Sequence, residues 1–150
     1  MPALTRNPAI KLIWSLHRWI LQASGGRIGA RIVGLPVLLL YTQGRKTGRL
    51  RINPLCYLRQ DTAYIVVGSN GGADTHADWY LNLRAQQQVW IEVNGTRIDV
   101  KVRQLARAEA ERNYQQFAKV YSGYARYKRR TKRHIPVIAL EPVKTVSSER

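Results

Sequence analysis

The strongest fold signal in the sequence is the segment Val89-Trp90-Ile91-Glu92-Val93-Asn94-Gly95-Thr96-Arg97-Ile98-Asp99-Val100-Lys101-Val102. Apolar and polar residues alternate on both sides of Asn94-Gly95, and this pattern is typical of a β-hairpin with a type I′ turn. A two-residue loop also places Glu92 opposite Arg97, as an opposite-charge pair. On the other face the same register gives three pairs: Val93–Thr96, Ile91–Ile98 and Val89–Val100.

Outside this hairpin, four apolar or β-branched runs predict further strands, and two segments predict helices. Asp74 or Thr75 is expected to cap the first of these helices, and Pro136 predicts an edge strand or the start of a strand. Sequential, hairpin-joined strands with a few helices indicate a mostly β, α+β fold, a small antiparallel barrel decorated by helices. The strands are expected at Leu35–Tyr41, Ile52–Leu58, Ala63–Ser69 and Ile135–Leu140, and the helices at 74–85 and 108–120.

The chain is expected to be one barrel domain over residues 31–142, preceded by an N-terminal segment, 1–30, and followed by a tail, 143–150. Within 1–30, an amphipathic helix starting near Asn7-Pro8 has a wide apolar face, two tryptophans and basic flanks. It is too short and too polar to span a bilayer. It fits either a membrane interface or packing over the end of the barrel.

The 150 residues carry a formal net charge of +16 and a pI near 10.8. Such a chain attracts nucleic acid, an anionic membrane or a multiply charged small molecule, although a merely solvated basic surface has the same composition. The single cysteine, Cys56, and the lack of a signal peptide favour a cytoplasmic location, with a peripheral position on the inner face of the plasma membrane left open. The three histidines lie far apart, so no metal site is predicted.

A basic turn joins the first two of the predicted strands. Residues 44–51 (Gly-Arg-Lys-Thr-Gly-Arg-Leu-Arg) hold four cations and two glycines. Such a turn can present backbone N–H groups and fixed charge to a phosphate. It is not a P-loop, because that motif requires glycine immediately before the lysine, and here Arg45 precedes Lys46.

Three tyrosines, Tyr121, Tyr124 and Tyr127, follow one another at a spacing of three residues. This spacing puts them on one face of a helix. Such a stripe is compatible with core packing or with a wall against a flat aromatic ligand.

Taken in order, these motifs resemble the deazaflavin-dependent nitroreductase family, which includes the F-420H2-dependent quinone reductases. The resemblance implies a flavin-reductase-like split β-barrel, reduced coenzyme F-420 as hydride donor, and quinones or nitroaromatic and other activated unsaturated compounds as electron acceptors. It runs from about residue 35 to 142 and rests on Gly44-Arg45-Lys46-Thr47-Gly48, Arg51, Asn53-Pro54-Leu55, Ser69-Asn70-Gly71-Gly72, Trp79-Tyr80-Leu81-Asn82-Leu83, the tyrosine triplet, Ile135-Pro136-Val137 and Glu141-Pro142.

The resemblance also implies roles for particular residues. Lys46 and Arg51 contact the cofactor phosphate, Ser69 and its turn lie near the deazaflavin ring, and a tyrosine of the triplet is a proton donor. Family members can carry an aromatic residue where this chain has Cys56, so ring packing is expected to differ there. Implied cofactor contacts are Arg45, Lys46, Thr47, Gly48, Arg51, Asn53, Pro54, Ser69, Asn70 and Trp79, and implied catalytic residues are Tyr121, Tyr124 and Tyr127.

Three other functions remain compatible with the sequence: an FMN- or haem-binding protein with the same barrel, a basic nucleic-acid-binding protein, and a non-catalytic lipid-binding relative. The cations are spread along the chain and no known nucleic-acid motif is present, so nucleic acid is not the expected partner. The sequence leaves open whether the protein is a monomer or a homodimer.

Overall fold

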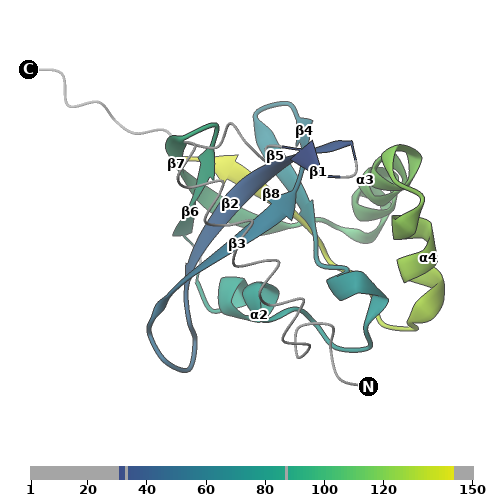
Figure 1. The fold of residues 1–150 in the computed structure, drawn as a ribbon, viewed down its shortest axis with the longest axis horizontal. Helices are drawn as coiled ribbons and strands as arrows, with labels where there is room; N and C mark the ends of the chain where they lie inside the picture. Colours follow the sequence, from purple (N-terminus) through teal and green to yellow (C-terminus); the bar gives the residue numbers. More distant parts are fainter. Residues whose placement is uncertain (1–30, 33, 87, 144–150) are drawn as a thin grey trace, which may run out of the picture.

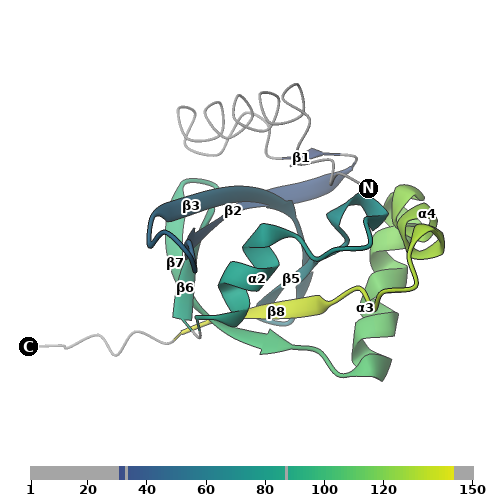
Figure 2. The same cartoon turned by 90° about the horizontal axis from the view of Figure 1, so that it is seen from below.

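The structure, a computed structural model, describes residues 31–32, 34–86 and 88–143. The helix expected near residues 8–22 and the tail beyond residue 143 lie outside the described residues. In the described part, antiparallel strands curl into a barrel, helix α2 lies at one side of it, and α3 and α4 lie together at one end (Figures 1 and 2).

The strands follow the order β1-β2-β6-β7-β8-β5-β4, and β3 pairs with β2, with every pairing antiparallel. The mostly β, barrel-like fold predicted from the sequence is therefore present. The elements are β1 (Arg31–Ile32), β2 (Leu35–Gln43), β3 (Leu50–Cys56), β4 (Leu58–Gln60), β5 (Ala63–Val67), η2 (Asn70–Gly72), α2 (Asp78–Arg84), β6 (Gln88–Val93), β7 (Thr96–Gln104), α3 (Arg107–Val120), α4 (Gly123–Arg130) and β8 (Val137–Pro142).

The predicted Asn94-Gly95 hairpin forms β6 and β7, with each predicted pair in register. Asn94 (φ 50°) and Gly95 (φ 81°) take the left-handed conformation that a type I′ turn requires. Glu92 and Arg97 lie opposite each other as predicted, but their side chains bond to other residues. Arg97 lies 3.1 Å from Asp99 and covers the ring of Trp90, while Glu92 accepts a 2.7 Å hydrogen bond from the hydroxyl of Tyr41.

Three other details differ from the sequence predictions. The second predicted strand is split at Tyr57, because the chain changes its partner there: β3 pairs with β2, whereas β4 pairs with β5. Helix α2 begins at Asp78 after Ala77, and Asp74 instead accepts a hydrogen bond from Thr131. Pro136 directly precedes β8, which lies between β7 and β5, so the strand-start interpretation was correct and the edge-strand one was wrong.

Two hydrophobic clusters lie on opposite faces of the sheet. Tyr64 and Val66 of β5 point into the barrel with residues of α2, whereas Ile65 points outward against Phe117 of α3 and Tyr124 of α4. Alternate side chains of a strand point to opposite faces, so a strand covered on both sides is buried along its whole length, as all five residues of β5 are. The helices thus cover two different parts of the barrel.

Candidate functional site

The basic turn forms the tip of the β2–β3 hairpin. Gln43 pairs with Leu50, and the six residues between them close through hydrogen bonds from Gly44 N–H to the Arg49 carbonyl (2.7 Å) and from Gly48 N–H to the Gly44 carbonyl (2.8 Å). Gly48 has φ +70°, which glycine adopts without strain. The turn is therefore a defined loop, and the N–H of Gly48 is used inside it.

Helix α2 holds this loop through two amides. Asn82 is buried, and its Oδ1 accepts from the backbone N–H (3.1 Å) and the Nη1 (2.8 Å) of Arg45. Gln86 donates to the carbonyl of Gln43 (2.5 Å) and accepts from its N–H (3.1 Å). Arg45 also lies 3.5 Å from Asp78, so its guanidinium faces α2 and serves mainly to attach the loop.

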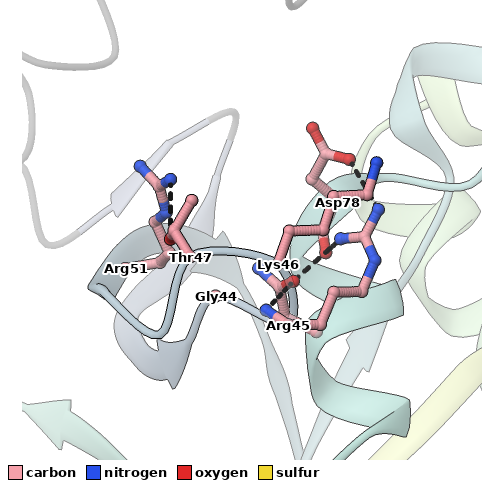
Figure 3. A pocket seen from close by; sticks show the side chains of 7 residues that line it. Gly44, Arg45, Lys46, Thr47, Arg51 and Asp78 are labelled. Atoms are coloured by element: carbon pink, nitrogen blue, oxygen red, sulfur yellow. Dashed lines mark hydrogen bonds and ion pairs between the residues drawn. The ribbon is translucent and has the colours of Figure 1, made fainter.

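A hollow of ≈ 200 Å³ opens between the loop and α2 (Figure 3). Thr47 accepts from the backbone N–H of Arg49 (3.2 Å) and, at 3.4 Å, from Arg51 Nη2. Lys46, Arg49 and Arg51 are exposed, and among the described residues none of them has an acidic partner. The hollow is lined by Gly44, Arg45, Lys46, Thr47, Arg51, Asp78 and Asn82.

The backbone N–H groups of Lys46 and Thr47 have no hydrogen-bond partner within the described part of the chain. Two free N–H groups beside exposed cations are the donor set that a phosphate or carboxylate takes in proteins. Asp78 brings one negative charge to the rim, which Arg45 offsets. The loop can therefore bind an anion.

Six of the predicted cofactor contacts lie outside the hollow's lining: Gly48, Asn53, Pro54, Ser69, Asn70 and Trp79. Asn53 and Pro54 lie in the middle of β3, opposite Leu40 and Leu39, and Pro54 is buried. Trp79 is 9% exposed and belongs to the cluster inside the barrel, where it packs edge-on against Tyr80 at 6.3 Å between ring centroids. In the structure Trp79 is a residue of α2 that packs into the core of the barrel, and its contact with the cofactor stays a prediction.

The Ser69 turn lies at the other end of the segment that leads into α2. Ser69 is buried, and its carbonyl accepts from the N–H of Gly72 (2.9 Å). Asn70, Gly71 and Gly72 all have positive φ, of 48°, 64° and 80°. A Cβ on Gly72 would lie 2.9 Å from the Cα of Tyr127, so the turn packs directly on the backbone of α4.

The three tyrosines of the triplet form one cluster. Tyr124 and Tyr127 lie on α4, but Tyr121 ends α3 in an extended conformation, so the predicted single helical face was wrong in detail. The rings nevertheless touch edge to face, with centroids 5.6–6.4 Å apart. The ring of Tyr121 lies over Gly123, where an added Cβ would be 2.0 Å from its Cε2.

The three hydroxyls have different partners. Tyr124 is buried, and its hydroxyl donates to the sulfur of Cys56; burial and this bond raise the pKa of Tyr124. Burial raises the pKa of the Cys56 thiol to about 11. Tyr127 is hydrogen-bonded to Tyr121, and burial together with this bond raises the pKa of Tyr127. Tyr121 and Tyr127 are half-buried, so their hydroxyls are the more accessible pair.

The two predicted site regions lie at opposite ends of the long axis of the molecule. The β2–β3 loop is at one end and α4 at the other, with α2 between them in both views (Figures 1 and 2). The Ser69 turn and α2 belong to one continuous stretch, residues 69–84, that reaches from the tyrosine cluster to the basic loop. This stretch is the wall along which an elongated ligand could contact both ends.

Sequence reasoning missed three residues that build these regions: Asn82, Gln86 and Arg133. Arg133 bonds to the Ser69 turn from a position 64 residues further along the chain. Asn82 could have been found, because it is a polar residue on the apolar face of a predicted helix. Arg133 could not, because nothing local separates it from the other cations of residues 128–133.

Comparison with known proteins identifies the family. The profile of the F-420H(2)-dependent quinone reductase family matches residues 14–142. The chain belongs to this family. An F-420H(2)-dependent quinone reductase of Mycobacterium tuberculosis strain H37Rv is 36% identical over 146 residues, covering 91% of this chain and 94% of the relative. The resemblance inferred from the sequence motifs is confirmed, and the protein is an oxidoreductase of the deazaflavin-dependent class.

Solved structures agree on the fold. An F-420-H2 dependent reductase (FDR-A) superposes with a TM-score of 0.64 at 33% identity, covering 71% of this chain and 94% of that one. A chain described as a domain-swapped dimer gives a TM-score of 0.66 at 29% identity over 90% of this chain and all of that one. The haem storage protein HutZ of Vibrio cholerae, at 15% identity and a TM-score of 0.53, shares the fold alone. The predicted split β-barrel is confirmed.

Proposed function

We propose that this protein reduces quinones with F-420H2, and that the cofactor spans the two ends of the 69–84 stretch. The observation that carries this proposal is the pairing of an anion-binding loop with a cluster of aromatic hydroxyls at the far end of one wall. A cofactor with a phosphate at one end and a flat ring at the other matches this arrangement. The family assignment supplies the identity of that cofactor.

At the loop end, Lys46 and Arg51 would give charge-assisted hydrogen bonds to the phosphate, which are about twice as strong as neutral ones. The free N–H groups of Lys46 and Thr47 would complete the donor set. They take the place of the Gly48 N–H, which is already bonded to the Gly44 carbonyl. Arg45 would act indirectly, by fixing the loop on Asn82. The residues present fit an anionic group of this kind.

At the other end, the Ser69 turn and the tyrosine cluster would flank the ring. The bound cofactor supplies the chemistry itself, a hydride from its deazaflavin ring to the acceptor. The protein needs to orient the acceptor, exclude water and stabilise the negative charge that develops on the acceptor oxygen. Asn70 would contribute to the turn's shape, since its amide donates to the carbonyl of Thr75 (3.0 Å).

The proton for the acceptor oxygen would come from Tyr121. Tyr121 is half-buried and its ring contacts that of Tyr127, with centroids 6.4 Å apart, so Tyr121 would give its proton to the acceptor and Tyr127 would replace it. Tyr124 already donates to Cys56 within the core. We therefore assign Tyr124 a positioning role, although all three tyrosines were predicted to be catalytic.

The first test is cofactor binding by the purified protein. Titration with F-420, followed by quenching of its fluorescence, should give saturable binding in the micromolar range or tighter. FMN under the same conditions should not bind comparably, and the protein as isolated should show no haem or flavin absorbance. Binding of FMN without F-420 would refute the cofactor assignment.

The second test is the identity of the acceptor. F-420H2 oxidation should be followed against menaquinone analogues, nitroaromatic compounds and other activated unsaturated compounds. We expect quinones to give the highest kcat/KM, because a quinone oxygen can accept the Tyr121 proton directly. A clear preference for nitro compounds would show that nitroaromatic compounds, and not quinones, are the preferred acceptors.

The assembly state and the location of the protein are two further proposals. One structural relative is a domain-swapped dimer, so we propose a homodimer, which sedimentation equilibrium can test. In the described part of the chain, the helices all lack the length and apolar character needed to cross a bilayer. We propose a cytoplasmic enzyme whose N-terminal segment, 1–30, contacts the membrane, to be tested by co-sedimentation with anionic vesicles with and without that segment.

A further inference from the structure

Arg133 makes an unusual set of contacts for a residue in a basic run. It lies between α4 and β8 and is partly buried. Its side chain makes four polar contacts with the segment 68–76: Nε with the carbonyl of Ala73 (3.1 Å), Nη1 with the carbonyl of Gly68 (3.3 Å), Nη1 with Nδ1 of His76 (2.9 Å), and Nη2 with the carbonyl of Ser69 (2.9 Å).

The segment that Arg133 grips needs outside support. It contains three consecutive residues with positive φ, Asn70, Gly71 and Gly72, and a 3-10 turn of only three residues. Besides Arg133, two outside groups in the described part of the chain bond to this segment: the Pro136 carbonyl accepts from the Gly68 N–H (2.9 Å), and the Thr131 hydroxyl donates to Asp74 (2.9 Å). The remaining bonds lie within the segment. Without Arg133, the carbonyls of Gly68 and Ala73 would lose their side-chain donor.

The same turn sets the spacing to the tyrosine cluster. Gly72 packs against the backbone of Tyr127, and the α4–β8 connection that carries Arg133 directly follows α4. Arg133 therefore ties the Ser69 turn to the connection that follows α4, the helix that carries Tyr124 and Tyr127. A guanidinium suits this task because its planar fork can reach several carbonyls at once.

We propose that Arg133 is a positioning residue that holds the Ser69 turn in the shape that receives the cofactor ring. This proposal rests on the ring placement given under the proposed function. His76 is part of the device. Arginine has only donors, so Nδ1 of His76 must be the acceptor, and the imidazole must be neutral with its proton on Nε2.

Protonation of His76 would oppose this clamp. A second N–H would face the Arg133 donor. Arg133, Arg84 and His134 lie around the ring, the tilted ring of Tyr80 from α2 contacts it with centroids 4.8 Å apart, and Asp74 lies near Arg133. Burial first, and then these cations, lower the pKa of His76 below 6.5. The contribution of the neutral His76–Arg133 contact to the stability of the folded protein is thus complete above about pH 6.5. It is lost as the pH falls through the lowered pKa of His76.

The experiment compares Arg133→Lys with Arg129→Lys in the full chain. Lysine keeps the charge but lacks the fork, and Arg129 is an exposed neighbour in the same basic run. We expect Arg133→Lys to speed amide hydrogen exchange over residues 68–76 in the cofactor-free protein and to raise the Kd for F-420 about tenfold. Arg129→Lys should change neither.

Each outcome is decisive. If amide hydrogen exchange over residues 68–76 is unchanged in Arg133→Lys, then Arg133 does not hold the turn. If exchange is faster but the Kd for F-420 is unchanged, then Arg133 does not position the cofactor site, provided that Ser69→Val weakens F-420 binding. If Ser69→Val also leaves the Kd unchanged, the ring placement in the proposed function is what fails.

A second variant covers a failure of Arg133→Lys to fold. His76→Asn keeps an acceptor near Nδ1 but does not titrate. Between pH 7.5 and 5.5, the Kd for F-420 should rise more in the natural protein than in His76→Asn, and any titration of the cofactor cancels in that comparison. Parallel pH profiles would overturn the proposal.

Discussion

The two ends of the candidate site are built in opposite ways. The basic loop at Gly44–Arg51 is mostly exposed, closes through bonds between near neighbours, and is attached to α2 by two amides. The Ser69 turn packs against α4 through the buried Gly72 and is held by a guanidinium from 64 residues away. Exposed charge suits the capture of a ligand's anion, whereas a tightly packed turn suits the exact placement of a reacting ring.

This contrast predicts that adding a Cβ will lower stability more in the Ser69 turn than in the basic loop. Gly72→Ala should destabilise the protein by about 3 kcal/mol, because it adds a Cβ at φ +80° that meets backbone atoms of Tyr127 at 2.9 and 3.0 Å. Gly48→Ala, at φ +70°, should cost only about 1 kcal/mol, because its nearest neighbour is the flexible side chain of Gln43 at 3.6 Å. Urea denaturation of both variants measures the difference; equal losses would mean that the two ends are equally rigid.

Removal of charge from the basic loop should weaken cofactor binding and leave the stability of the protein almost unchanged. Lys46→Ala combined with Arg51→Ala should raise the Kd for F-420 about a hundredfold, since each lost charge-assisted bond is worth ~1.5–3 kcal/mol before the remaining donors compensate. The midpoint of unfolding should hardly move, because both side chains are exposed. The matched control is Arg112→Ala with Lys119→Ala on α3. F-420 binding that survives the first double change intact would refute the phosphate site.

The same contrast explains what the sequence could reveal. The Asn94-Gly95 hairpin was predicted to the residue, because turn chemistry and alternation act over a few neighbours. The basic loop was recognisable for the same reason, including Lys46 and Arg51. The loop's attachment to Asn82 and Gln86 depends on how α2 packs, so it could only be read from the structure.

The ring end was predictable only in outline. The tyrosine spacing indicated a cluster, and the cluster exists, but Tyr121 leaves the helix and the three hydroxyls differ in exposure and partners. Trp79 was predicted at the cofactor and lies in the barrel core. Arg133 carries no local signal, because its importance comes from contacts that span 57 to 65 residues.

The tyrosines can be separated by single hydroxyl deletions. Tyr121→Phe should lower kcat with a quinone roughly tenfold, less than the usual ~10²–10⁴ for a general acid, because water can also protonate the product oxygen. Tyr124→Phe should leave kcat within about twofold and instead lower stability by about 1 kcal/mol, through the lost bond to Cys56. Steady-state kinetics and urea melts decide this. A large kcat loss confined to Tyr124→Phe would make Tyr124 the proton donor.

The smallest effect is expected at Cys56, which faces Tyr124 from β3. Because burial raises the pKa of this thiol to about 11, the group is neutral between pH 7 and 9 and accepts the Tyr124 hydroxyl without carrying charge. Cys56→Ser also offers a neutral acceptor, so it should change stability by less than about 1 kcal/mol and leave kcat unchanged. Cys56→Ala removes the acceptor and should cost about 1–2 kcal/mol, with the same kcat.

Cys56→Ser and Cys56→Ala test the positioning role of Tyr124 by changing its hydrogen-bond partner. If Tyr124 only positions its neighbours, both variants keep kcat, and only Cys56→Ala loses stability in urea. If instead Cys56→Ala raises kcat, the freed hydroxyl of Tyr124 reaches the acceptor. The cysteine would then be the feature that keeps Tyr124 out of the reaction in this chain.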